Sequence, residues 1–375
     1  MENKNSNAIK FNYIDSRFTP DDTTKGLFMF LIIQTVVTLA YQVLYMMGFV
    51  QSFWSYVFTL IIDAGFVTSV IMIAKSKRID PFANLKVKKK PNFKQILIAM
   101  GISIICLFGF SALTNLFMEI LYRAGYSSVV SDIVIPDFGT YIFYVFMICV
   151  VPAICEEVLF RGLICNGLKK LGTTTAVFLS AFLFMIMHGS PDQTVHQFIL
   201  GIILALAFLI SNNLWVPIIV HFLNNFIAVT ISYVAYGDSA EEVVTETAQM
   251  YLSDYLFYAI TSAVVAGVIL YFLFKALSNC SKVEEKVEPV EQKNIVFPVQ
   301  DYKMNYTGNY SEFSNESTMK NVEEVNNNVV EPIQVGTIEE EKKFTGTGKA
   351  LLILSIVWLA FDWLSALVAG FSAIY

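Results

Sequence analysis

Charged side chains are scarce in this chain, and their scarcity narrows the class of protein. Charged residues make up 15% of the 375 residues and hydrophobic residues 55%, whereas soluble domains carry about 25% charged residues. This composition excludes a water-soluble fold and predicts an integral membrane protein whose surroundings are the lipid bilayer. The net charge of −6 comes largely from a polar C-terminal segment and a short acidic loop. No basic groove for nucleic acid is therefore expected.

Cysteine and histidine are also few. The five cysteines are scattered, and four of them lie in apolar runs, which argues against a disulfide framework or a zinc ribbon. The first 25 residues are long and polar, which argues against a cleaved signal peptide. Only three histidines occur, His188, His196 and His221, so each of them bears on the search for a site.

Long apolar runs account for most of the chain. A spanning helix needs about 20 mostly apolar residues, and the candidate spans lie at 26–49, 54–74, 95–121, 140–165, 173–189, 194–211, 213–236, 255–277 and 350–374. We therefore predict an all-α fold, a polytopic transmembrane helix bundle of about 8 helices at residues 26–277. A tail at 1–25 precedes it. A disordered linker at 278–349, rich in Asn, Glu and Lys, and one extra C-terminal transmembrane helix at 350–375 follow it.

Lysine and arginine in the short connections predict the orientation. The segment 75–94 carries eight of these residues and should face the cytoplasm. Alternation then places the N-terminal tail and the linker at 278–349 in the cytoplasm, and the loops at 122–139 and 237–249 outside. The Asn-, Lys- and Ile-rich composition favours a bacterial chain and hence a plasma membrane.

Three polar motifs interrupt the apolar runs: Glu156-Glu157-x-x-x-Arg161, Phe184-x-x-x-His188 and His221-x-x-x-Asn225. A charged side chain at the centre of a membrane helix costs at least about 2.5–3.5 kcal/mol, so these groups indicate a site. On a helix, Glu157 and Arg161 share one face and pair, while Glu156 points about 100° away. A structural ion pair explains Glu157 and Arg161 but leaves Glu156 unexplained.

The other polar residues have simpler interpretations. His188, or His221 with Asn225, could each serve only to bind neighbouring helices. His196 is interpreted as a solvent-facing loop residue, and Asp362 in the last span as packed toward other helices. Straight parallel helices would hold Glu156, His188 and His221 at different depths, so tilted or broken helices are required.

Together, Glu156, His188, His221 and Asn225 provide the groups for hydrolysis. A carboxylate takes a proton from water, and imidazole and amide N–H groups stabilise an oxyanion. A metal site with Zn²⁺ bound by His188, His221 and Glu156 is the rival design. We favour the glutamate mechanism without a cofactor, because a metal at Glu156 would leave only the paired Glu157 as base, and the helix signature H-E-x-x-H is absent.

In this order, the three motifs resemble those of the CAAX protease and bacteriocin-processing family, also called Abi or Rce1-like proteins. The resemblance covers roughly residues 95–236 and matches all seven motif positions: Glu156, Glu157, Arg161, Phe184, His188, His221 and Asn225. It implies an intramembrane endopeptidase, in a family usually classed with the metalloproteases, that acts on a prenylated or bacteriocin-like peptide or protein at the membrane. It also implies that Glu156 and His188 activate water, and that His221 and Asn225 hold the oxyanion.

Two other functions compete with this expectation. A non-catalytic membrane protein could use the same cluster to bind a peptide, as in bacteriocin immunity. A transporter would also carry buried ionisable residues, but the sequence shows no internal repeat with paired broken helices.

Overall fold

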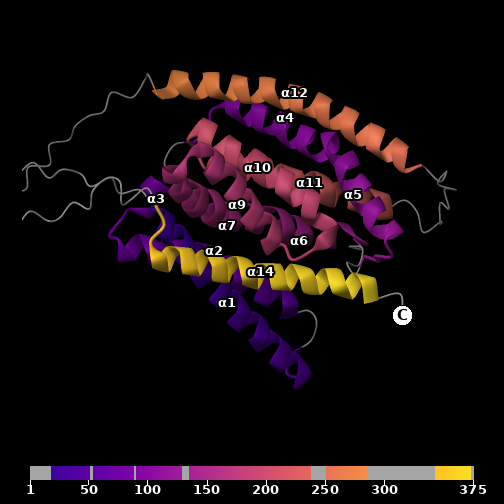
Figure 1. Cartoon of the computed structure of the whole chain (residues 1–375), viewed down its shortest axis with the longest axis horizontal. Helices are drawn as coiled ribbons and strands as arrows, with labels where there is room; N and C mark the ends of the chain where they lie inside the picture. The colour runs from indigo at the N-terminus through magenta and orange to yellow at the C-terminus, as the bar shows by residue number, and fades with distance from the viewer. Residues whose placement is uncertain are drawn as a thin grey trace, which may run out of the picture.

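The computed structural model describes residues 18–50, 54–87, 90–128, 135–237, 251–285 and 343–372. Within these residues the fold is the predicted all-α bundle, and eight helices are long and apolar enough to cross a membrane. A further apolar helix, α9 (Thr173–Met187), is shorter. Figure 1 shows most of the helices running side by side, with α12 and α14 along opposite edges of the bundle.

The first two helices form a hairpin. Helix α1 (Pro20–Met46) packs on α2 (Trp54–Ser76). The predicted N-terminal tail at 1–25 is too long, because α1 already begins at Pro20. Thr19 and Asp22 form a capping box there, and Pro20 occupies the first turn, both of which favour a helix start. Residues 1–17 lie outside the described residues.

The span predicted at 95–121 consists of two helices. After the short α3 (Pro81–Asn84), α4 (Phe93–Gly109) ends one residue before α5 (Ser111–Arg123) begins. Gly109 lies against α12, where a Cβ on Gly109 would be only 2.6 Å from the Cβ of Ala266. The break at Phe110 therefore coincides with a close approach between helices that only glycine allows.

The central span is also longer and less regular than the predicted 140–165. It runs from α6 (Phe138–Tyr144) through the π-helical segment η1 (Val145–Val150), α7 (Val151–Glu157) and the π-helical η2 (Val158–Cys165). The short α8 (Asn166–Leu168) and η3 (Lys169–Leu171) complete it. Pi-helical turns are rare and often occur at functional sites.

The remaining helices follow in short succession. After α9 come η4 (Pro191–Gln193), α10 (Thr194–Ser211), α11 (Trp215–Gly237) and α12 (Leu252–Glu285). Helix α14 (Gly346–Ser372) is the predicted C-terminal span and begins earlier than residue 350. The linker prediction of 278–349 is wrong at both ends, because residues 278–285 continue α12 and residues 346–349 begin α14. Its middle, 286–342, lies outside the described residues.

Contacts between distant segments place the ends of the helices on two sides of the bundle. On one side, Asp22 near the start of α1 binds Lys77 after α2, and Asp21 accepts from the backbone N–H of Thr345 before α14. On the other side, the N–H of Ser127 donates to the carbonyl of Gly370 near the end of α14. This two-sided arrangement matches the alternation of the predicted connections.

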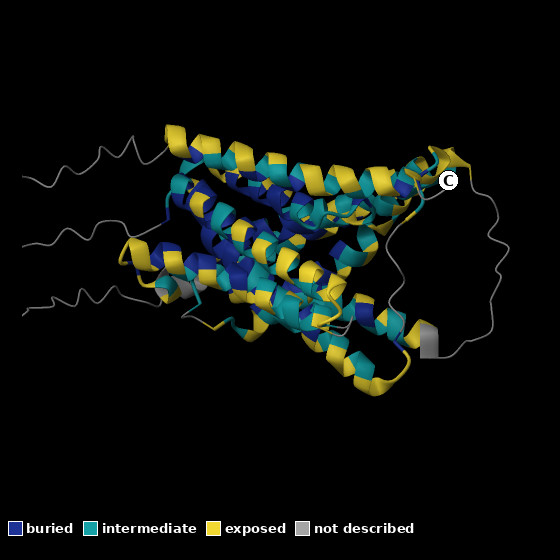
Figure 2. Ribbon diagram, turned by 90° about the horizontal axis from the view of Figure 1, so that it is seen from below, coloured by how far each residue is buried: buried dark blue, intermediate teal, exposed yellow. Residues whose placement is uncertain are grey.

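Buried residues gather in the middle of the bundle, while exposed apolar side chains cover its outer helices (Figure 2). An apolar exterior is what a bilayer requires of a spanning protein. Arg161 is the largest of the fully buried side chains. A cation at the centre of an apolar core needs charged and polar partners, and the candidate site supplies them.

Candidate functional site

A buried ion pair joins α7 to η2, as the i,i+4 spacing predicted. Oε1 of Glu157 lies 2.8 Å from Nη1 of Arg161, and both side chains are fully buried. The same oxygen lies 2.9 Å from Nδ1 of His221 on α11. Arg161 also donates from Nη2 to the carbonyl of Gly201 on α10, at 3.1 Å. Glu157 and Arg161 therefore pair with each other and connect four segments of the chain, α7, η2, α10 and α11.

Phe184 contacts Arg161 of the ion pair and both histidines of the motifs. Cζ of Arg161 is 4.4 Å from the centroid of the Phe184 ring, within the range of a cation–π interaction. The rings of His188 and His221 pack edge-to-face with Phe184, at centroid distances of 4.7 and 5.8 Å. The second motif therefore supplies a buried ring that holds both imidazoles in place.

The ring of His188 is oriented by the backbone of its own helix. Its Nδ1 lies 2.8 Å from the carbonyl oxygen of Phe184. A carbonyl oxygen only accepts, so Nδ1 must carry the proton, and in the neutral ring Nε2 is left with a lone pair. Nε2 lies 4.0 Å from Oε2 of Glu156. A hydrogen-bond acceptor therefore faces the carboxyl group of Glu156.

The side chain of Glu156 points to a different side of the helix from that of Glu157, as the turn of about 100° per residue predicted. Its side chain is 12% exposed, and its Oε2 has no hydrogen-bond partner among the described residues. The gap of 4.0 Å to His188 is too long for a direct hydrogen bond, and a separation of this kind is one that water commonly bridges. Oε2 of Glu157 also has no partner among the described residues, but its Oε1 binds both Arg161 and His221, so Glu156 is the carboxylate of the motif with fewer fixed contacts.

Asp63 is a site residue that was not predicted from the sequence. It lies on α2, which packs against α7, and its carboxylate interacts electrostatically with Glu156. Only 5% of Asp63 is exposed, and its Oδ2 has no partner among the described residues. The signal was present in the sequence, because Asp63 is a charged residue within a spanning run and the cost of burying it is the same as for the motif residues.

Asn225 is bound to the irregular part of the central span. Its amide Nδ2 donates to the carbonyl of Ile148 at 2.9 Å. Pro152 lies four residues after Ile148 and has no N–H, so it cannot make the usual helical hydrogen bond to that carbonyl. One N–H of Asn225 takes that place, which leaves its second N–H for another acceptor.

His196 is not the solvent-facing loop residue that was predicted. It lies on α10 and is half-buried, with Nε2 at 3.2 Å from Nδ2 of Asn224. Asn224, which was not predicted either, is 3% exposed and donates to Oδ1 of Asn225 at 3.4 Å. This contact orients the amide of Asn225, so its nitrogen faces Ile148. The prediction failed because His196, near the start of α10, contacts Asn224 of α11, and a contact between helices is not visible in the sequence.

The alternative expectation was a metal site formed by His188, His221 and Glu156. Among the described residues, no group of three or more His, Cys, Asp or Glu side chains is placed to hold a metal ion. Nδ1 of His188 and Nδ1 of His221 bind the carbonyl of Phe184 and the carboxylate of Glu157, so only the Nε2 atoms of the two rings could bind a metal. The described residues thus present no ready set of three metal ligands, and the mechanism proposed below uses no metal.

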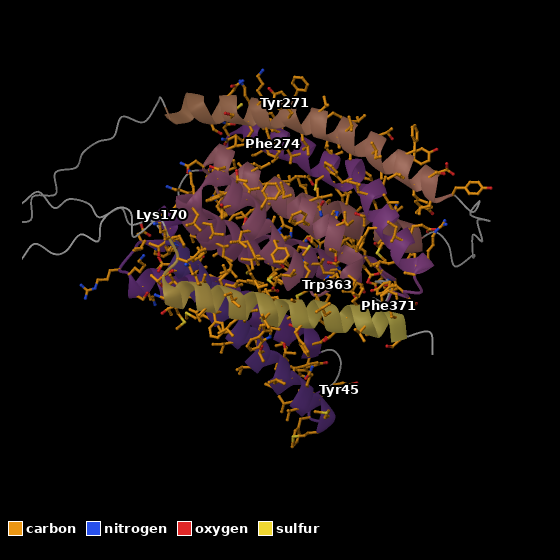
Figure 3. The ribbon with its side chains drawn as sticks, viewed as in Figure 1. Tyr45, Lys170, Tyr271, Phe274, Trp363 and Phe371 are labelled. Atoms are coloured by element: carbon orange, nitrogen blue, oxygen red, sulfur yellow. The ribbon has the colours of Figure 1, made fainter. Side chains whose placement is uncertain are left out.

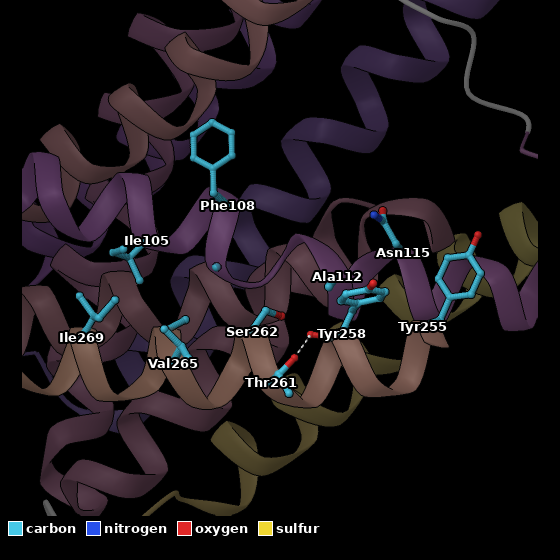
Figure 4. A pocket seen from close by; sticks show the side chains of 12 residues that line it. Ile105, Phe108, Ala112, Asn115, Tyr255, Tyr258, Thr261, Ser262, Val265 and Ile269 are labelled. Carbon is cyan, nitrogen blue, oxygen red and sulfur yellow. Dashed lines mark hydrogen bonds between the residues drawn. The ribbon is translucent and has the colours of Figure 1, made fainter. Parts of the chain in front are cut away.

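A separate cavity of about 880 Å³ lies between α4, α5 and α12 (Figure 4). Its walls are mostly apolar, with Tyr255, Tyr258 and Asn115 at one end. None of the motif residues lines it. It is therefore not part of the polar cluster.

Comparison with known proteins gives one match. The family model described as "Type II CAAX prenyl endopeptidase Rce1-like" matches residues 138–227, which include all seven motif positions. No curated protein and no solved structure gives a significant match. Residues 138–227 of this integral membrane protein therefore carry an Rce1-like domain, and this domain supports a CAAX-type intramembrane peptidase.

Proposed function

We propose that this protein hydrolyses a peptide bond within the membrane by means of a water molecule that Glu156 and His188 activate. The observation that carries the proposal is the pair of facing acceptors, Oε2 of Glu156 and Nε2 of His188, 4.0 Å apart. A water molecule between them would donate one hydrogen to each. Its oxygen lone pair would then point away from both, toward a substrate carbonyl.

The proton balance of the reaction uses only these groups. The water oxygen attacks the carbonyl carbon while its proton passes to Glu156, and a tetrahedral oxyanion forms. The second N–H of Asn225 and the Nε2–H of His221 stabilise that oxyanion; for this role the ring of His221 must carry both protons. Collapse of the intermediate breaks the C–N bond, and the proton held by Glu156 moves to the leaving amine.

The adjacent glutamate supports this division of roles. Glu157 is fully buried and bound to Arg161 and His221, so it orients His221 and takes no proton from water. The substrate of the proposed reaction is a peptide or protein at the membrane. We extend the proposal to a prenylated or bacteriocin-like peptide, on the basis of the Rce1-like match.

Glu156→Gln tests the proposal, because it keeps the size of the side chain and removes the base. The assay uses the full chain in lipid vesicles with quenched fluorescent peptides, including farnesylated peptides that end in Cys-a-a-X. We expect kcat to fall by about 10²–10⁴-fold, the usual contribution of a general base, with peptide binding retained. Glu119→Gln is the matched control, because Glu119 pairs with Arg123 outside the cluster, and its activity should equal that of the wild type.

The non-catalytic alternative makes the opposite prediction. If the cluster only binds a peptide, Glu156→Gln would leave the biological activity intact and no peptide would be cleaved by the wild type. The metal-dependent alternative is tested by metal analysis of the purified protein and by chelator treatment. A stoichiometric metal, whose removal abolishes cleavage, would replace the glutamate mechanism.

A further inference from the structure

Asp362 occupies an unexpected position in α14. It was predicted to pack toward other helices, and this prediction is wrong, because its side chain is exposed. At about 1.5 Å per residue, Asp362 lies about 24 Å from Gly346 and about 15 Å from Ser372. These positions place it well inside a hydrocarbon core about 30 Å thick. A carboxyl group therefore faces the surroundings of the bundle at membrane depth.

The described part of this chain supplies no partner for Asp362. No ion pair or hydrogen bond of its side chain occurs there, and Arg161, the one cation near the middle of a described span, is fully buried against Glu157. An aspartate side chain is short, so it cannot extend to the membrane surface as lysine and arginine do. A second copy of the chain would therefore bring no cation to Asp362 from the described spans.

The neighbours of Asp362 form a face suited to another helix. Ser365, Ala369 and Ser372 are exposed and follow Asp362 at spacings of three, seven and ten residues, which places them on one stripe of the helix. Their small side chains allow a second helix to approach closely, and polar groups stabilise such contacts in lipid. Bulky exposed residues flank the stripe: Val357, Phe361, Leu364 and Val368.

The bundle already covers the face of α14 next to the stripe, which includes Ser355 and Leu359 at seven and three residues before Asp362, so the stripe is open only from Asp362 to Ser372. Nε1 of Trp363 donates to Oγ1 of Thr194 at 2.9 Å, and Ser355, Leu359 and Gly370 are buried. Figure 3 shows Trp363 and Phe371 on this helix at the edge of the molecule. Helix α14 is therefore held against the bundle on one side and presents the stripe that contains Asp362 on another.

We propose that this stripe of α14 binds a transmembrane helix of another protein that carries a lysine or arginine near its middle. The cation pairs with Asp362, and the small residues Ser365 and Ala369 let the two helices approach. The proposal depends on the exposure of one carboxyl group at membrane depth and is independent of the hydrolytic mechanism.

The test uses the full chain in phosphatidylcholine vesicles, with a fluorescence donor at its C-terminus and an acceptor on a leucine–alanine transmembrane peptide. One peptide carries a central lysine, and its matched control carries leucine instead. We expect the lysine peptide to bind the wild type about tenfold more tightly, which corresponds to about 1.4 kcal/mol. Asp362→Asn should abolish this preference, Asp362→Glu should restore it, and Ile353→Leu, on the exposed face but away from the stripe, should not change it.

Three outcomes would overturn the proposal. Equal binding of the two peptides to the wild type would show that Asp362 does not select a cation. A preference that persists in Asp362→Asn would place the binding site elsewhere. Energy transfer between two labelled copies of the chain that is lost in Asp362→Asn would show that the stripe joins two copies instead. Circular dichroism of each variant confirms that the helical fold is retained.

Discussion

At the scale of single residues, two adjacent glutamates have different roles because a helix turns by about 100° per residue. Glu157 is fully buried and binds Arg161 and His221 through Oε1, whereas Glu156 is partly exposed and faces His188 at 4.0 Å. The carbonyl of Phe184 assigns the proton of His188 to Nδ1. Two adjacent positions of the chain thus hold a carboxylate that is fixed by two partners and the carboxylate that we propose as the base.

Arg161→Met should lower the free energy of unfolding by about 3–5 kcal/mol, because removal of one partner leaves the buried carboxylate of Glu157 uncompensated. Denaturant titration in mixed micelles measures the change. The double variant Glu157→Gln with Arg161→Met should regain most of the loss, since no lone charge remains. A double variant as unstable as Arg161→Met would show that the pair acts through packing and not through charge.

Asp63→Leu should raise the free energy of unfolding by about 1–3 kcal/mol, because it removes a buried polar group with an unpartnered oxygen. Its peptidase activity should nevertheless fall, because Asp63 interacts with Glu156. A stable variant of low activity is typical of residues kept for function. Ser69→Ala on the same helix is the control, and it should change activity little. A destabilised Asp63→Leu would instead indicate a structural role.

At the scale of helices, the irregular central span brings the motifs together. Two π-helical segments flank α7, and Pro152 in its first turn lacks the N–H that would bond to Ile148. Asn225 of α11 donates to the carbonyl of Ile148. The irregular part of the central span is thus bound to α11 through the hydrogen bond from Asn225 to Ile148, and the site lies beside this contact. The span remains one continuous helix from Phe138 to Leu171, so its irregularity is π-helical and is not the break that was one of the two expectations.

Pro152→Ala should lower kcat while it leaves the protein folded. Alanine restores an N–H that competes with Asn225 for the carbonyl of Ile148, so Asn225 is released and the oxyanion loses a donor, a change worth up to about 10²-fold. Steady-state kinetics measures the effect. Pro217→Ala is the control, because Pro217 lies in the first turn of α11, where its missing N–H has no helical partner. Equal activities of the two variants would contradict the role of Pro152.

At the scale of the whole molecule, contacts between helix ends establish which connections share a side. Asp21 with Thr345 and Asp22 with Lys77 join the start of α1, the end of α2 and the start of α14. The carbonyl of Lys86 accepts from the N–H of Leu214 on that same side. This side includes residues 75–87 and 90–94 of the lysine-rich segment, so we propose that it faces the cytoplasm of a bacterial cell.

Cysteine labelling tests this orientation in intact cells. In a cysteine-free chain, Lys90→Cys should react with a membrane-impermeant thiol reagent only after the cells are permeabilised. Ala124→Cys, at the opposite side of the bundle, should react without permeabilisation. The reverse pattern would show that the molecule is inverted in the membrane. Both positions are exposed, so access of the reagent does not depend on local unfolding.

The sequence was sufficient for the features that depend on composition and on spacing within one helix. A scarcity of charge and long apolar runs predicted the membrane bundle. The i,i+4 spacing predicted the pair of Glu157 with Arg161 and the separate face of Glu156. These features depend on local geometry, and α-helical geometry is nearly the same in every protein.

The contacts between helices required the folded structure, because they join residues far apart in the chain. Asp63 and Glu156 lie on neighbouring helices because α2 packs on α7, and His196 contacts Asn224 because α10 packs on α11. Asp362 is exposed because α14 turns Trp363 toward Thr194 instead. The rotation of each helix about its axis follows from packing against all its neighbours at once. Most of the polar residues of the site could therefore be predicted from the sequence. Which of them contact one another is decided by the packing of the helices.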